Sequence, residues 1–171
     1  RVVPHKNILT IVQAFKKLPE KKLVVIGDGP LLADLKDIKS DNIQFLGYQN
    51  DNVVNTYMRE ARALIFSAEE DFGIVPVEAQ ACGTPVIALE KGGAVDTVIE
   101  GVTGIFYPEN TPEHLVMAIQ RFESMPAFDP EKIRFNAERF SEIKFVEKIE
   151  KVVREGYSQF KSKSKMHVVL R

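Results

Sequence analysis

The sequence has one cysteine, Cys82, and no apolar run long enough to span a bilayer. A single cysteine excludes an internal disulfide framework and suits a reducing cytosol. No signal peptide is visible either. We therefore expect a cytoplasmic location, and a peripheral position at the inner membrane face stays open for a longer form of the protein.

The chain also lacks an excess of charge of either sign, because it has 23 basic and 24 acidic residues and a net charge of −1. No overall field draws such a chain to nucleic acid, so no nucleic-acid partner is expected. The three histidines include no pair at a spacing typical of metal ligands, and Cys82 stands alone, so the sequence predicts no metal site. The length of 171 residues fits one domain.

Short apolar segments alternate with amphipathic ones. Strands apolar on both faces and separated by helices predict a parallel sheet covered on each side, which is a Rossmann-like, doubly wound α/β domain. In such sheets ligands bind beyond the carboxyl ends of the strands. The expected strands are 22–27, 43–47, 63–66, 86–89 and 104–106, and the expected helices between them lie at 30–38, 51–60, from 75 onward and at 94–99.

Three further helices are expected to begin near Thr111, Asp129 and Ser141. We place the domain at 1–160 and predict a solvated or disordered end at 161–171, in preference to a membrane-touching segment. The first residue falls directly inside a motif, so the chain is expected to be an excised domain.

The most informative stretch runs from Glu70 to Pro85 and places a glycine loop between an apolar strand and a helix. Free backbone N–H groups and the helix dipole at such a junction favour an anion, so a phosphate site is the first interpretation. Glu70 and Glu78 flank the loop. Glu78 also fits a simple favourable acid in an early helical turn, and Glu70 has acidic neighbours that fit a solvated loop.

This stretch closely resembles the Glu-x7-Glu motif of the retaining GT-B glycosyltransferases of family 4, and within it the bacterial and archaeal mannosyltransferases. Segments 83–88 and 92–98 continue the resemblance, and 1–7, 27–30 and 47–49 match further family segments. Together these matches cover nearly the whole chain. In this family, the chain would correspond to the C-terminal, donor-binding half of a GT-B fold.

The resemblance implies a role for each motif residue. Glu78 would bind the ribose hydroxyls, and Glu70 would lie beside the donor sugar. Arg1 and Lys6 would clamp the diphosphate. Backbone groups of the loop after Glu70 would contact the diphosphate as well, and these belong to Phe72, Gly73, Ile74 and Val75.

Two glycine-containing turns complete the expected site. Gly92 and Gly93 would offer a second amide pair, although Asp96 stands where the family commonly has Glu. Gly47, Tyr48 and Gln49 resemble the loop that holds the base. Tyr48 is interpreted either as a stacking side chain or, preferably, as an interfacial tyrosine with a satisfied hydroxyl.

The predicted function is transfer of a hexose, with mannose from GDP-mannose favoured, onto a glycan or lipid-linked acceptor. The family implies no bound cofactor or metal, a separate N-terminal acceptor-binding domain, and an inactive isolated fragment. A GT-B-fold nucleotide-sugar epimerase and a non-catalytic nucleotide-binding module remain the alternatives.

Overall fold

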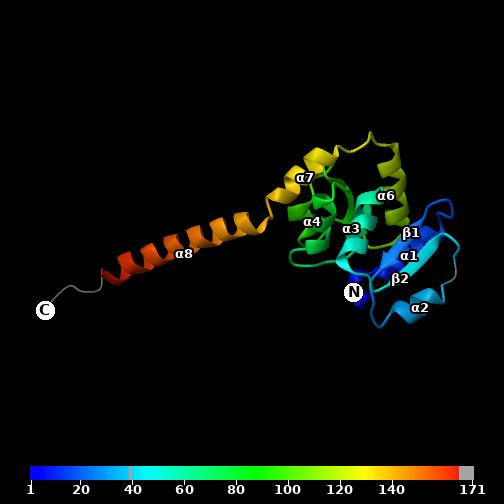
Figure 1. Cartoon of the computed structure of the whole chain (residues 1–171), viewed down its shortest axis with the longest axis horizontal. Coiled ribbons are helices and arrows are strands. Elements are labelled where there is room, and N and C mark those ends of the chain that lie inside the picture. Colours follow the sequence, from blue (N-terminus) through cyan, green and yellow to red (C-terminus); the bar gives the residue numbers. More distant parts are fainter. Residues whose placement is uncertain (39, 166–171) are drawn as a thin grey trace. The chain divides into compact units, whose positions relative to one another are not determined.

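A computed structural model describes residues 1–38 and 40–165 (Figure 1). The chain divides into two compact units, and the boundary between them in the sequence follows Ala137. The elements along the chain are η1 (Pro4–Lys6), α1 (Ile8–Lys16), β1 (Leu23–Ile26), α2 (Leu32–Lys36), β2 (Ile43–Gly47), α3 (Asp51–Glu60), β3 (Leu64–Phe66), α4 (Ile74–Ala81), β4 (Val86–Leu89), α5 (Ala94–Thr97), β5 (Gly104–Tyr107), α6 (Pro112–Ser124), α7 (Pro130–Glu138) and α8 (Glu142–Lys165).

All strand pairs among the described residues are parallel, which confirms the predicted α/β class. The hydrogen-bonded ladders form two groups, β1–β2 and β3–β4–β5, where the sequence predicted one sheet. Each crossover carries a helix, as parallel pairing requires. The carboxyl ends of β3 and β4 therefore lie at the same edge of the three-stranded sheet, and the loops that follow them are neighbours.

Helix α1 was missed by the sequence analysis, which read the first seven residues only as a loop. Its apolar residues Ile11, Val12 and Phe15 recur at helical spacing and are buried. The helix begins at Ile8, two residues after Lys6, so it anchors the basic loop to the core.

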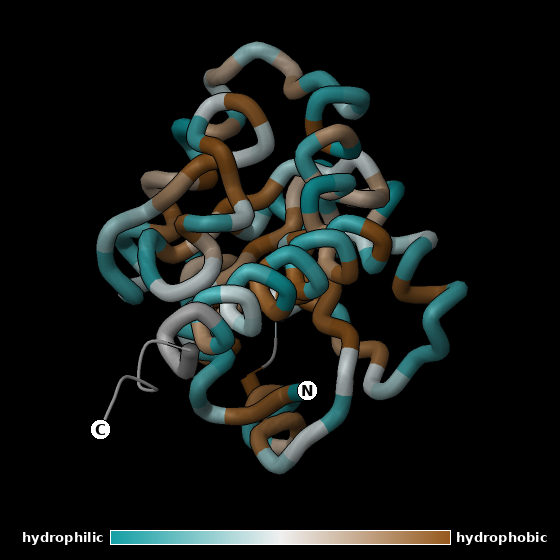
Figure 2. Tube along the Cα trace, turned by 90° about the vertical axis from the view of Figure 1, so that its left-hand side faces the viewer, coloured by the Kyte–Doolittle hydropathy of each residue, from teal (hydrophilic) through white to brown (hydrophobic). Residues whose placement is uncertain are grey.

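Hydropathy along the trace alternates in short stretches of hydrophobic and hydrophilic residues (Figure 2). This is typical of short strands and amphipathic helices. Among the described helices, none is both long enough and apolar enough to cross a membrane.

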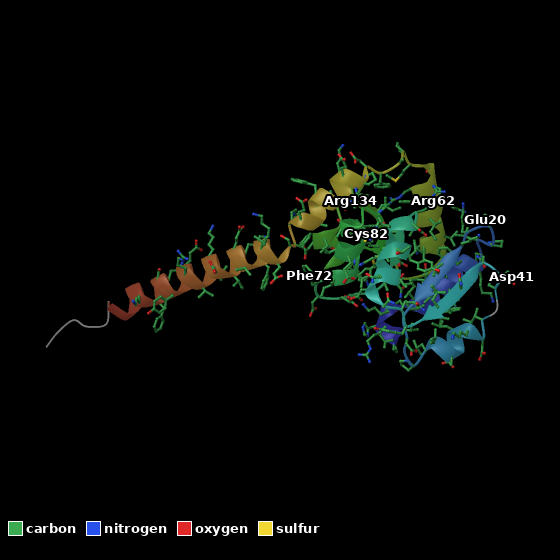
Figure 3. All side chains as sticks on the ribbon, in the orientation of Figure 1. Glu20, Asp41, Arg62, Phe72, Cys82 and Arg134 are labelled. Atoms are coloured by element: carbon green, nitrogen blue, oxygen red, sulfur yellow. The ribbon has the colours of Figure 1, made fainter. Side chains whose placement is uncertain are left out.

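The C-terminal end of α4 is closed by a glycine and an arginine. Gly83 adopts φ +84°, and the N–H groups of Gly83 and Thr84 donate to the carbonyls of Gln80 and Ala79. This is the left-handed termination that glycine favours. Arg134 on α7 donates to the carbonyl of Cys82 at 3.3 Å (Figure 3). The end of α4 is thereby tied to α7.

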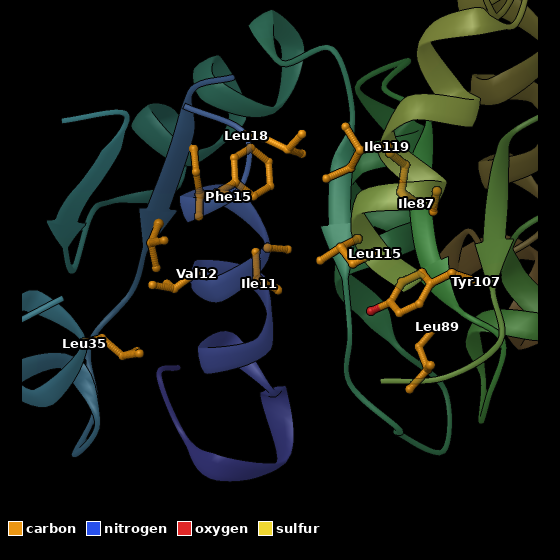
Figure 4. Packing of buried hydrophobic residues seen from close by; sticks show 14 of the residues in the cluster. Ile11, Val12, Phe15, Leu18, Leu35, Ile87, Leu89, Tyr107, Leu115 and Ile119 are labelled. Carbon is orange, nitrogen blue, oxygen red and sulfur yellow. The ribbon is translucent and has the colours of Figure 1, made fainter. Parts of the chain in front are cut away.

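Alternate residues of β4 enter two separate cores. Ile87 and Leu89 pack in one cluster with residues of α1, β5 and α6 (Figure 4). Val86 and Ala88 pack in the other, which includes residues of α4 and α5. All four side chains are buried. A strand buried on both faces explains the uninterrupted apolar sequence and fixes β4 as the centre of its sheet.

Helix α8 belongs to the second unit and exposes the described side chains along its length. It continues to Lys165, so the first five residues of the predicted end, 161–165, lie within the helix. Residues 166–171 of that prediction lie outside the described residues. The exposed apolar side chains of α8 are Ile143, Phe145, Val146, Ile149, Val152, Val153, Tyr157 and Phe160.

Candidate functional site

The acidic loop, residues 67–73, joins β3 to α4. It leaves the core at Ser67 and Ala68, which are buried, and becomes exposed at Asp71 and Phe72. Gly73 caps α4 with φ +76°, a conformation that an L side chain rarely adopts. Phe66 lies 3.4 Å from the position of an added Cβ, which is ordinary contact, so the backbone angle and not lack of space requires glycine here.

The first turn of α4 presents unused amides. Within the described residues, no protein acceptor is recorded for the backbone N–H of Ile74 or Val75. Pro76 follows them and has no N–H to satisfy. Unpaired N–H groups at a helix start carry the positive end of the helix dipole and attract an anion. The amides of Ile74 and Val75 are therefore not occupied by protein acceptors, and the predicted anion site stays a prediction.

The basic loop, residues 1–7, reaches the acidic loop from the other end of the chain. The Lys6 ammonium contacts the Glu70 carboxylate, and the two side chains are 21% and 22% exposed. Lys6 also lies over the ring of Phe66, 5.8 Å from its centroid. The Nε2 atom of His5 lies 4.0 Å from Glu70. Two predicted site residues that are 64 positions apart are thus brought into direct contact.

Arg1 is exposed, in contrast to Lys6. The next residue is fixed, since the N–H of Val2 donates to the carbonyl of Asp28 at 2.9 Å. Gly29 permits this approach, because a Cβ there would lie 2.2 Å from the Val2 oxygen. The 27–30 turn therefore holds the start of the basic loop in place, while the structure does not bring the Arg1 side chain to Glu70.

Gly92 and Gly93 serve close packing. The N–H of Gly93 donates to the Glu70 carbonyl at 2.6 Å, so this half of the predicted amide pair is already used by the protein. A Cβ on Gly92 would lie 2.4 Å from the Glu70 carbonyl oxygen, and one on Gly93 would lie 2.3 Å from that of Phe72. The turn after β4 thus packs directly against the backbone of the acidic loop and holds it by a hydrogen bond.

Glu78 lies in the second turn of α4 and is exposed. The structure does not bring it into contact with Lys6 or Glu70. It lines an open depression of about 400 Å³ whose other lining residues come from α3, from the end of α4 and from α7. These residues are Asn55, Arg59, Ala81, Cys82 and Arg134. Its carboxylate is therefore accessible to a ligand, as a ribose-binding role requires.

The predicted base-binding turn follows β2. Gly47 has φ +68° and accepts a hydrogen bond from the N–H of Gly27 at 2.8 Å, which joins the turn to the end of β1. Gln49 donates to the Leu46 carbonyl at 2.9 Å, so its side chain closes the turn. Tyr48 is 78% exposed. Exposure of this extent leaves the ring available for stacking on a base and is equally open to the interfacial position that the sequence analysis preferred.

The sequence analysis gave no role to three residues: Asn7, which ends the basic loop, Ser67, which begins the acidic loop, and Tyr107, which is buried against Ser67. The Tyr107 hydroxyl is 2.5 Å from the Ser67 hydroxyl in the buried interior. Burial raises the pKa of Tyr107 to about 12, against a smaller lowering by the Ser67 hydrogen bond. A polar residue before a periodic apolar run indicates a helix cap at Asn7. Nothing local in the sequence marks Ser67 or Tyr107.

The described residues contain no group of three His, Cys, Asp or Glu side chains that could hold a metal ion. Lys6 and Glu70 form an ion pair between the two loops, and the His5 ring lies beside Glu70. The site combines a cation, a carboxylate and helix amides at the carboxyl edge of a parallel sheet. This defines the class as a parallel α/β domain with a glycine loop at the carboxyl edge of its sheet.

The chain belongs to the family described as "Glycosyl transferases group 1", whose sequence profile matches residues 1–140. It is 34% identical over 118 residues to an "uncharacterized glycosyltransferase" of Methanocaldococcus jannaschii, covering 66% of this chain and 33% of that protein. It is 37% identical over 107 residues to the "N-acetyl-alpha-D-glucosaminyl L-malate synthase" of Bacillus anthracis, covering 58% and 28%. The chain therefore spans about a third of the length of these relatives.

Solved structures resemble the chain over most of its length. An Anabaena protein crystallised with UDP and glucose has a TM-score of 0.70 and 26% identity, covering 92% of this chain and 46% of that one. The sucrose-phosphate synthase of Thermosynechococcus elongatus has a TM-score of 0.77 and 28% identity, covering 91% and 43%. The neighbours confirm the GT-B glycosyltransferase fold class, of which this chain corresponds to less than half.

Proposed function

We propose that this chain is the donor-binding domain of a retaining glycosyltransferase of family 4, which transfers a hexose from a nucleoside diphosphate sugar. The observation that carries the proposal is the contact between Lys6 and Glu70 beside the amides of Ile74 and Val75. A cation and helix amides suit a diphosphate, and a carboxylate beside them suits the hydroxyls of the attached sugar.

The chemistry follows from these positions. The bond between the anomeric carbon and the diphosphate oxygen breaks, and the diphosphate leaves with the electron pair. Lys6 and the amides of α4 stabilise the negative charge that develops, and Arg1 would add a second cation once a ligand orders it. The acceptor hydroxyl attacks on the same face and passes its proton to the departing diphosphate, so the anomeric configuration is retained.

Glu78 is assigned to the ribose, because a carboxylate accepts hydrogen bonds from two neighbouring hydroxyls and the depression beside it is open. Tyr48 is assigned to stacking on the base, which its exposure supports. The acceptor, a glycan or lipid-linked molecule, would bind a further N-terminal domain. This is supported by the chain's spanning only a third to a half of its relatives' length.

Two donors are compatible with these groups. The resemblance of the 70–80 segment to mannosyltransferases favours GDP-mannose. The neighbour crystallised with UDP and glucose and the relative that is an N-acetyl-alpha-D-glucosaminyl L-malate synthase favour a UDP-sugar. Calorimetric titration of the chain with UDP, GDP and ADP separates them. We expect one of the first two to bind at least tenfold more tightly than ADP, and equal or absent binding of all three would contradict the proposal.

A further inference from the structure

We propose that Asn7 is a positioning residue of the donor site, which holds Lys6 at the acidic loop through one side-chain hydrogen bond between the two loops. The inference rests on the proposed function, because it concerns how the cation for the diphosphate is placed. Asn7 itself contacts neither Glu70 nor any predicted ligand group; it acts through Lys6.

The backbone of Asn7 is unusual. Among the described residues it is the one non-glycine residue with a positive φ, at 54°. It ends η1 and begins α1 at the same time, since its N–H donates to the Pro4 carbonyl at 3.0 Å and its carbonyl accepts from the N–H of Thr10 at 3.1 Å. The direction of the neighbouring Lys6 is therefore set by this residue. Glycine adopts such angles with less strain, so the presence of asparagine points to its side chain.

The side chain is not used in the way expected at a helix start. An asparagine there ordinarily accepts a hydrogen bond from the first helical turn, but the Asn7 side chain makes no capping bond. Its Nδ2 atom donates instead to the Ser67 carbonyl, at 2.8 Å and across 60 residues. The hydrogen bond thus connects the basic loop to the first residue of the acidic loop.

The far end of this connection is fixed. Ser67 is buried at the end of β3, and its hydroxyl is bound to the buried Tyr107 hydroxyl. Ser67 stands three residues before Glu70, and Asn7 stands one residue after Lys6. The two loops are therefore joined at their bases, immediately behind the contact of Lys6 with Glu70. Without this connection, only the ends of the basic loop would remain fixed, by Val2 and by α1, and the direction of the Lys6 side chain would be held less closely.

A double-mutant cycle on the 171-residue chain tests the proposal, with UDP and GDP as calorimetric probes. Asn7→Gly keeps the left-handed backbone and removes the connection, and Lys6→Ala removes the group that the connection positions. We expect Asn7→Gly to weaken binding of the preferred nucleotide about fivefold in the Lys6 background and less than twofold in the Lys6→Ala background. Coupling of this kind identifies a residue that acts through another.

Two further variants separate positioning from stability. Asn7→Asp keeps the shape but presents no donor to the Ser67 carbonyl, so it should weaken binding as much as Asn7→Gly. The Thr111 hydroxyl caps α6 by accepting a hydrogen bond from the N–H of His114, and Thr111→Gly removes this cap. We expect Thr111→Gly to lower thermal stability about as much as Asn7→Gly does and to leave nucleotide affinity unchanged.

The possible results distinguish failure of this inference from failure of the proposed function. Equal fold-losses from Asn7→Gly in both backgrounds, or wild-type affinity in Asn7→Asp, would overturn the inference and leave the proposed function standing. No loss of affinity in Lys6→Ala, or no binding of UDP and GDP by the wild type, would overturn the proposed function and the inference together.

Discussion

Glu70 and Glu78 belong to one motif, yet the structure supports them in different ways. Glu70 is mostly buried, contacts Lys6 and has its own carbonyl bound by the N–H of Gly93. Glu78 is exposed on α4 and lines an open depression. A supported carboxylate with a fixed cation suits the reacting centre, where geometry must be held closely. An exposed carboxylate suits ligand binding, because the bound ligand itself then supplies its hydrogen-bond partners.

The largest effect is expected at Glu70. Glu70→Gln in the full-length enzyme should lower kcat for transfer, or for hydrolysis of the nucleotide sugar, by about 100-fold. Nucleotide affinity should stay within threefold or increase, because Lys6 loses its carboxylate partner and is free to meet the diphosphate. Steady-state kinetics and calorimetry on the same preparation check both parts. A loss of affinity with unchanged kcat would reverse the two roles.

The support beneath Glu70 is tested by Gly93→Ala. The added Cβ would lie 2.3 Å from the Phe72 carbonyl oxygen, so the backbone of the acidic loop must move. We expect a loss of about 2 kcal/mol in the free energy of unfolding, measured by urea titration. The control is Gly156→Ala in α8, where nothing lies within 4 Å of the added Cβ. Equal stability of the two variants would show that the acidic loop is not held by this turn.

Tyr107, whose hydroxyl is bound to Ser67 at the start of the same loop, is expected to make stability depend on pH. Burial raises the pKa of Tyr107 from 10.0 to about 12, so the folded protein keeps the neutral phenol at pH values where the unfolded chain loses its proton. The contribution of Tyr107 to the free energy of unfolding is therefore fully present below pH 10 and is lost as pH rises toward 12. At pH 11 the loss relative to pH 9 is about 1.4 kcal/mol. Tyr107→Phe should remove this decline, as followed by urea unfolding at both pH values. A decline of the same size in the phenylalanine variant would assign it to other groups.

The smallest effect is expected at the exposed acid. Glu78→Gln should raise the Kd of the preferred nucleoside diphosphate about fivefold, or about 1 kcal/mol, and leave kcat at saturating donor unchanged. The reason is that a carboxylate accepts stronger hydrogen bonds from ribose hydroxyls than an amide does. The deoxyribose form of the nucleotide supplies the control, since its affinity should change less. Equal losses for both nucleotides would remove Glu78 from the ribose.

The sequence predicted those features that depend on local pattern. The apolar runs at β4 and β5 and the glycine before α4 predicted parallel strands and a helix that begins after a glycine turn, because these follow from periodicity and from backbone angles. The contact of Lys6 with Glu70 was not predicted: the family resemblance only placed both residues at the donor, and no spacing rule connects residues so far apart.

What the sequence did not predict depends on packing between distant segments. Gly93 was interpreted as an amide for the ligand, but its N–H is taken by Glu70, and only the closeness of two backbones reveals this. Ser67 and Tyr107 are common residue types whose importance comes from burial side by side. Helix α1 was overlooked even though the spacing of Ile11, Val12 and Phe15 was available.

The central claim is that the first turn of α4 and Lys6 receive a diphosphate. Amide chemical shifts of the ¹⁵N-labelled chain, recorded during titration with UDP and GDP, test it most directly. We predict that Ile74 and Val75 show the largest shifts, together with the backbone around Lys6, and that the corresponding nucleosides leave these amides nearly unchanged. Nucleotide binding that shifts other amides and leaves Ile74 and Val75 unmoved would contradict the claim.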